Sequence, residues 1–193
     1  MYGDLQRNVE DRPVRAVDIA EYILRQFPGL VDAMKLQKLL YYTQAWSLAW
    51  GRGPMFPEAI EAWENGPVVP EVSREHPHRF SVDTVHGDAL RVAADPVRRA
   101  TITDVLNFYG ERSGQALSDL THTELPWRLT REVAGVVDGD HCNAEIDRGL
   151  IERYYEALAN NQHLDEDAER RLAQNRLNQQ GPLRSQPLVP EPA

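Results

Sequence analysis

Residues 35–50 read KLQKLLYYTQAWSLAW, the longest stretch of the chain that keeps a helical repeat without a helix-breaking residue. Its large side chains recur every three or four positions, so they fall along one side of an α-helix. This stripe consists of Leu36, Leu39, Leu40, Thr43, Trp46 and Trp50. A helix of this length spans about 24 Å, which is enough to cross a small domain. We therefore expect a central helix from Lys35 to Trp50 whose stripe faces the core.

The same stretch holds both lysines of the chain, Lys35 and Lys38, against 19 arginines elsewhere in the sequence. Because lysine is used so rarely, its retention at Lys38 beside Gln37 suggests a specific role for that ammonium group. The alternative is that both lysines are solvated, with their aliphatic stems lying on apolar surface beside the helix. The sequence leaves both interpretations open.

Composition indicates an ordinary globular protein, with 193 residues, 41% hydrophobic and 26% charged. No apolar run approaches the ~20 residues of a membrane span, and the polar start has no signal-peptide core. A single cysteine, Cys142, excludes an internal disulfide. We therefore expect a cytoplasmic protein. The net charge of −9 makes a nucleic-acid partner unlikely on electrostatic grounds and suits either solubility or a basic protein partner.

Local signals divide the first part of the chain. Residues 1–15 are charged and aperiodic, which predicts a flexible N-terminal arm. A first amphipathic helix is predicted over 17–27, either capped by Asp18 or beginning just before it. Asp32 is the predicted N-cap of the central helix, and Gly51 is its predicted C-terminal glycine.

Beyond the central helix, alternating residues before Asn65-Gly66 predict an extended segment and a tight turn, followed by a helix entered at Pro67 or Pro70. A short strand is expected near residues 80–85. Further helices are expected over 96–110, over 113–124 as one or two turns with Ser118 able to cap the second, over 126–135, and after a cap at Asn143.

The predicted architecture is mainly α, a compact domain of about five to seven helices around the central one, with one short β-hairpin as an optional addition. We expect three parts: an arm over 1–15, a helical domain over 16–160, and a polar, proline-rich C-terminal tail over 161–193.

Sequence motifs for catalysis or metal binding are absent. His76-Pro77-His78 and His141-Cys142 are the closest ligand pairs, and neither is followed by a second pair at metal-site spacing. Phosphate-binding glycine loops and a GxSxG nucleophile elbow do not occur. His122 and Glu124, two residues apart on a helix, are expected to point to different sides. The expectation is therefore no metal, no cofactor and no enzymatic activity.

Three linked motifs resemble the Panacea domain, a phage-associated family. They are KLQKLLYYTQAWSLAWGRGPMFPEAIEAWENGPVVPEV at 35–72, LSDLTHTELPW at 117–127 and IERYYEAL at 151–158. The resemblance implies a bacterial or prophage antitoxin that neutralises a cognate protein toxin, encoded by the adjacent gene, through direct binding. The oligomeric state is left open.

Carried onto this sequence, the family motifs mark positions of two kinds. The leucines and Trp46 are expected in the core, and Gly66 and Pro67 are expected to shape the backbone. The polar and aromatic positions either build a buried hydrogen-bond network or line a partner-binding groove. The candidate residues are Gln37, Lys38, Tyr41, Tyr42, Trp63, Gly66, Pro67, Val68, Pro70, His122, Pro126 and Trp127.

Other functions compete with this one. The uncommitted tail after Asn160 suggests a proteolytic adaptor that delivers its partner to a cytoplasmic protease. A cryptic enzyme would have to use His122, Glu124 or Cys142, although the nucleophile, base and oxyanion roles are unfilled by any motif. A DNA-binding repressor is disfavoured by the acidic charge.

Overall fold

The predicted central helix is the axis of the structure, a computed structural model that describes residues 12–137 and 139–180. It is α3, Ala33–Ala49. The Asp32 carboxylate accepts a hydrogen bond from the Lys35 amide at 2.7 Å, which confirms the predicted cap. Gly51 follows the helix with a φ of +65°, as a C-terminal glycine does.

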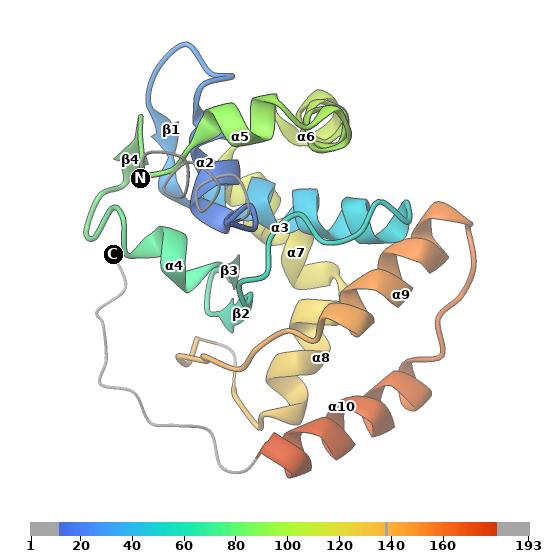
Figure 1. Ribbon diagram of the computed structural model, residues 1–193. Coiled ribbons are helices and arrows are strands. Elements are labelled where there is room, and N and C mark those ends of the chain that lie inside the picture. The colour runs from blue at the N-terminus through green and yellow to red at the C-terminus, as the bar shows by residue number, and fades with distance from the viewer. Residues whose placement is uncertain (1–11, 138, 181–193) are drawn as a thin grey trace, which may run out of the picture.

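Neighbouring helices enclose α3 on both sides. Figure 1 shows α2, α5 and α6 on one side of it and α7, α8 and α9 on the other. Its partly exposed residues are Met34, Lys35, Trp46 and Ala49. The leucines of the predicted stripe are buried, but Trp50 is 38% exposed, so the expectation that it faces the core is wrong. Trp50 is the C-cap residue, beyond the end of the helical repeat.

The described residues form nine helices and two pairs of short antiparallel strands, which confirms the mainly α prediction. Two of these helices, α4 and α5, are only four and five residues long. Besides α3, the elements are α2 (Ala16–Leu24), β1 (Val31–Asp32), β2 (Glu61–Trp63), β3 (Gly66–Val68), α4 (Pro70–Ser73), β4 (Ser81–Val82), α5 (Ala89–Ala93), α6 (Pro96–Tyr109), α7 (Gly114–Thr123), α8 (Leu125–Val133), α9 (Arg148–Ala159) and α10 (Glu166–Gln180).

Strands β2 and β3 form the predicted hairpin, with Trp63 opposite Gly66 and Glu61 opposite Val68. The other edge of β2 pairs with a segment far along the chain. The Ile146 amide donates to the Ile60 carbonyl at 2.8 Å. Helix α9 begins after this pairing rather than at Asn143, because Asp147 is its N-cap. The predicted Asn143 cap is therefore wrong.

Two other predicted caps take different roles. Helix α7 is continuous, and Ser113 caps it by accepting a hydrogen bond from the Ala116 amide at 3.1 Å. Ser118 therefore caps nothing and lies in the middle of the helix. Helix α2 begins just before Asp18, as one alternative proposed, and the Asp18 carboxylate accepts from the Arg15 amide at 2.9 Å.

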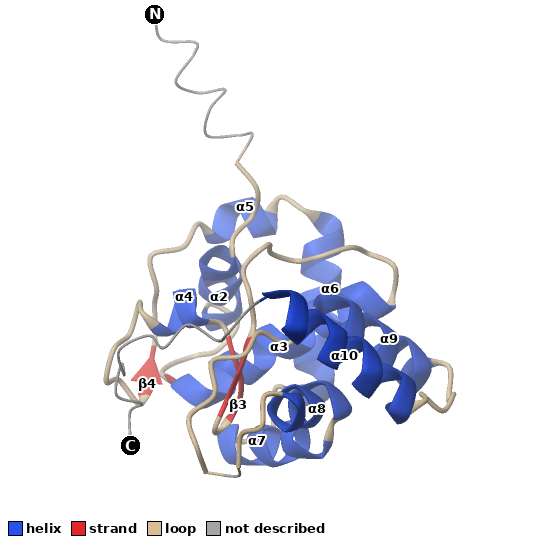
Figure 2. Ribbon diagram, turned by 90° about the horizontal axis from the view of Figure 1, so that it is seen from below, coloured by secondary structure: helices blue, strands red, loops and turns tan. Residues whose placement is uncertain are grey.

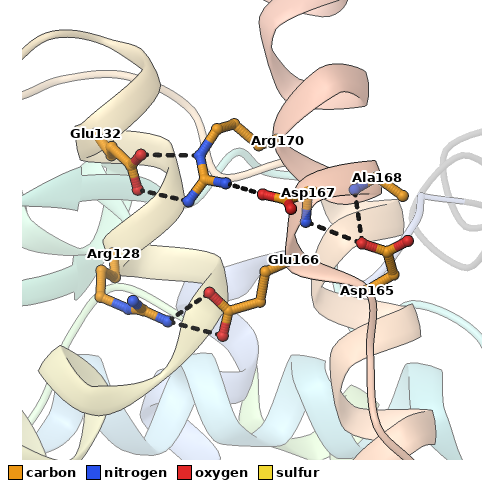
Figure 3. A network of polar contacts seen from close by, with 7 residues as sticks. All are labelled: Arg128, Glu132, Asp165, Glu166, Asp167, Ala168 and Arg170. Carbon is orange, nitrogen blue, oxygen red and sulfur yellow. Dashed lines mark hydrogen bonds and ion pairs between the residues drawn. The ribbon is translucent and has the colours of Figure 1, made fainter.

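Helix α10 forms an outer layer against α8 (Figures 1 and 2). Arg128 of α8 pairs with Glu166, and Arg170 pairs with Glu132 of α8 (Figure 3). The segment predicted as a tail thus starts with a helix packed on the domain. Residues 1–11 of the predicted arm and the proline-rich residues 181–193 lie outside the described residues, and the division into three parts stays a prediction.

Candidate functional site

Two motif residues on α3 hold the main chain that leads out of the hairpin. The Lys38 ammonium nitrogen donates to the Pro67 main-chain carbonyl at 3.1 Å, and the side-chain oxygen of Gln37 accepts from the Val69 main-chain amide at 2.8 Å. Both side chains are buried. The alternative in which the Lys38 side chain is solvated is therefore wrong. Lys38 is buried and holds the hairpin through its bond to Pro67.

Helices α7 and α8 brace the same hairpin. The Ser118 hydroxyl donates to the Asn65 carbonyl at 2.8 Å, and the Trp127 indole donates to the Trp63 carbonyl at 2.9 Å. The guanidinium of buried Arg131 donates to the Ala62 carbonyl at 3.0 Å. Side chains from three helices thus satisfy main-chain groups that the short ladder leaves unpaired, which fixes the hairpin in place.

Gly66 is required where the hairpin meets these braces. Its φ of +101° lies where only glycine is comfortable, as predicted for the turn. A Cβ atom at this position would lie 2.6 Å from the Thr121 hydroxyl oxygen and 2.8 Å from the Lys38 ammonium nitrogen. The close packing of α3 and α7 against the hairpin therefore depends on the missing side chain.

The motif prolines and Val68 shape the segments around this contact. Pro67 and Val68 lie in β3 and are buried. Pro70 is the first residue of α4, as one alternative placed it, and Pro126 lies in the first turn of α8. In these positions a proline starts a helix without losing a hydrogen bond.

His122 stacks on Trp127, with ring centroids 4.0 Å apart and planes inclined by 13°. Burial, reinforced by the nearby Lys38 charge, lowers the pKa of His122 below its ordinary value. The imidazole is consequently neutral at pH 7. Its Nε2 atom is buried and has no hydrogen-bond partner within the part of the chain that the structure describes. This half-buried ring fills space beside the hairpin.

A cavity of about 340 Å³ opens between the start of α3, the hairpin and residues 73–80. Four candidate residues from the motifs line it, namely Gln37, Lys38, Trp63 and Val68. The opposite wall includes His76, considered above only as part of a metal-ligand pair, and Phe80, which no motif indicated. Phe80 belongs to none of the recognised motifs. Its side chain is 64% exposed, and this exposure follows from the tertiary arrangement alone.

Tyr41 and Tyr42 lie apart from the cavity, in an aromatic cluster around the buried carboxyl group of Glu124. This group accepts hydrogen bonds from Tyr42 at 3.2 Å and from Tyr155 at 2.8 Å. Burial raises the pKa of Glu124 to about 7. Tyr41 is fully buried and packs edge-on against Tyr42, with centroids 5.4 Å apart. No local pattern identifies this cluster, because Tyr42 and Glu124 are 82 positions apart.

The three residues considered for catalysis do not form one constellation. His122 faces Trp127 whereas Glu124 faces the tyrosines, so they point to different regions as predicted. Cys142 is buried, and burial raises the pKa of its thiol. Within 12–137 and 139–180, no group of three or more His, Cys, Asp or Glu side chains is placed to hold a metal ion.

Over the same ranges, the structure has no helix with the length and apolar character needed to cross a membrane. The fold and the site define a mainly helical domain in which a central helix braces a largely buried hairpin beside a cavity. Residues 36–128 match the family model described as "Antitoxin SocA-like, Panacea domain". This match supports the resemblance to the Panacea domain that the motifs indicated. No curated protein and no solved structure matches the chain.

Proposed function

We propose that this protein is an antitoxin that neutralises a cognate protein toxin by direct binding in the cytoplasm, without catalysing a reaction. The observation that carries the proposal is the family match over residues 36–128, whose description is antitoxin-like. The matched range runs from α3 into α8 and includes the whole hairpin.

The geometry favours binding as the mode of action. Side chains from three helices hold the hairpin, so the wall that Trp63 and Val68 give to the cavity is preorganised, and preorganisation reduces the entropy lost on association. Trp63 lies on this hairpin and lines the adjoining cavity. Tryptophan is among the residues that most often anchor protein interfaces.

Co-expression of the chain with the product of the adjacent gene tests this function. We expect the chain to restore growth to cells that express the neighbouring protein and to co-purify with it as a stable complex. Failure of both rescue and co-purification would rule out the function for this chain. The control is a Gly66→Trp variant, in which the hairpin cannot pack against α3 and α7 and the candidate site is therefore disrupted.

The second candidate is a proteolytic adaptor. The ion pairs between α10 and α8 are exposed, whereas Glu169 of α10 is buried and pairs with Arg153 of α9. The proline-rich residues that follow α10 lie outside the described residues. A chain ending at Gln180 keeps α10 and its contacts. If the protein is an adaptor, this truncation leaves partner binding intact but prolongs the lifetime of the partner in cells. Unchanged partner turnover would leave only the sequestration mechanism.

A further inference from the structure

Two buried polar nitrogens lie in residues that line the cavity and have no hydrogen-bond partner among residues 12–137 and 139–180. They are Nε2 of Gln37 and Nε2 of His76, in side chains that are 4% and 5% exposed. The side-chain oxygen of Gln37 accepts a hydrogen bond from the main-chain amide of Val69, so the unpartnered side-chain nitrogen is held in place. Buried polar groups are normally satisfied, and those that are not need an explanation.

The groups required to satisfy these nitrogens are those of a peptide unit. The Gln37 nitrogen is a donor and requires an acceptor such as a main-chain carbonyl. His76 is neutral at pH 7, because burial lowers its pKa, so its free ring nitrogen either donates or accepts according to the tautomer. An extended peptide offers both kinds of group within one residue.

The remainder of the lining adds an apolar surface and a positive charge. Met34, Trp63 and Phe80 supply the apolar part. Arg79 stands at the same wall and has no ion pair in the described part of the chain. Lys38 is a second cationic side chain of the lining, and the two cations stand against the single carboxylate of Asp32. Although the chain has a net charge of −9, this corner is therefore complementary to an acidic ligand.

We infer that the cavity receives an extended segment of the toxin in which an apolar side chain is followed or preceded by a carboxylate. The segment's main chain bonds to Gln37 and His76, its apolar side chain packs against Trp63 and Phe80, and its carboxylate pairs with Arg79. This inference rests on the proposed antitoxin function and assigns its binding site.

A second exposed aromatic surface lacks these features. Trp50 and Phe108 are 38% and 67% exposed, and each has an arginine, Arg52 or Arg112, over its ring. Arg52 already pairs with Asp104 at 3.2 Å. None of the buried polar side-chain atoms that lack a partner in the described residues belongs to Trp50, Arg52, Phe108 or Arg112, so this surface provides a matched control for substitutions at the cavity.

The test compares four variants of the full chain, each measured for affinity toward the purified product of the adjacent gene. Phe80→Ser and Arg79→Glu alter the cavity at exposed side chains, so the fold is expected to survive, which thermal unfolding checks. Their controls are Phe108→Ser, a phenylalanine of similar exposure, and Arg99→Glu, an exposed arginine that does not line the cavity. We expect each cavity variant to raise Kd at least tenfold and each control to change it less than twofold.

The outcomes separate this inference from the function on which it rests. If wild-type chain neither binds nor protects cells, the antitoxin function itself fails. If wild-type chain binds and both cavity variants bind equally well, the function stands and the cavity is not the toxin site. Loss of binding in Phe108→Ser alone would move the interface to α6. A dimer of the free chain that Arg79→Glu dissociates would show a second copy in the cavity, which also overturns the inference.

Discussion

The ammonium nitrogen of Lys38 lies 3.1 Å from the main-chain carbonyl oxygen of Pro67, and both residues are buried. This bond joins the central helix to the hairpin across 29 positions of sequence. A buried ammonium group is costly unless it is well bonded, so the hairpin and the lysine stabilise each other's placement. The motif in which Lys38 occurs thus has a structural role beside the cavity.

Replacing this lysine by methionine should destabilise the fold. In Lys38→Met the Pro67 carbonyl is left buried without its donor, which costs about 1–3 kcal/mol. Lys35→Met is the control, since Lys35 is partly exposed and its ammonium lies 4.9 Å from the Phe27 ring centroid, a contact worth about 0.5–1 kcal/mol. Urea unfolding of the three chains measures the difference. Equal losses in the two variants would contradict the role assigned to Lys38.

Substitution of Gly66 by alanine should cost more than the same change at Gly53. Both glycines have positive φ, +101° and +78°, for which an L-residue pays about 1–3 kcal/mol. Only at Gly66 does the new Cβ also collide with Thr121 and Lys38, whereas the space around Gly53 is open. Denaturant midpoints compare the two variants. A Gly66→Ala chain as stable as Gly53→Ala would show that α7 yields to the added methyl group.

The raised pKa of Glu124 should make stability depend on pH. Between its ordinary value of 4.5 and about 7 the unfolded carboxyl group is ionised while the folded one keeps its proton. The unfolded state therefore binds fewer protons, and the free energy of unfolding falls as pH rises through this window. A shift of this size corresponds to about 3 kcal/mol. The full contribution is present below pH 4.5 and is lost above pH 7.

Glu124→Gln isolates this effect, because glutamine has the same shape and does not titrate. We expect the stability of wild-type chain relative to the variant to fall between pH 5 and pH 8, as measured by urea unfolding at each pH. Taking the difference cancels the contributions of groups such as His76 and His122, whose pKa values are lowered. Parallel curves for the two chains would mean that Glu124 ionises normally.

Helix α10 should detach more easily in salt than the rest of the domain. Its contacts with α8 include the exposed ion pairs of Figure 3, and the apolar cluster beneath it is small, with Leu125, Leu129 and Leu150 as buried members. Salt at roughly 0.5 M screens exposed ion pairs strongly. Hydrogen exchange should therefore accelerate in α10 while α3, which is enclosed by other helices, is unaffected. Salt-independent exchange in α10 would show that its apolar contacts suffice.

The sequence by itself determined the helix positions at which a local signal is strong. Asp32 and Gly51 bound α3 as predicted, and α6, Pro96–Tyr109, lies within the helix predicted over 96–110. Asp32 and Asp95 act through capping hydrogen bonds and Gly51 through a positive φ, so these signals lie within one turn and can be read without knowing the fold. At the two predicted caps that were wrong, distant contacts decided: Ala144 and Ile146, which follow Asn143, bond to the main chain of Ala62 and Ile60, and the Ser118 hydroxyl donates to the Asn65 carbonyl.

Tertiary structure alone decided which motif residues act together. Gln37, Lys38, Trp127 and His122 gather at the hairpin, while Tyr41 and Tyr42, on the same helix as Lys38, belong to the cluster around Glu124. Burial and pKa depend on every element packed around a group, and those elements come from distant parts of the chain. The periodicity of α3 therefore predicted a helix with an apolar stripe, but only the fold showed that its lysine is buried and that a cavity opens beside it.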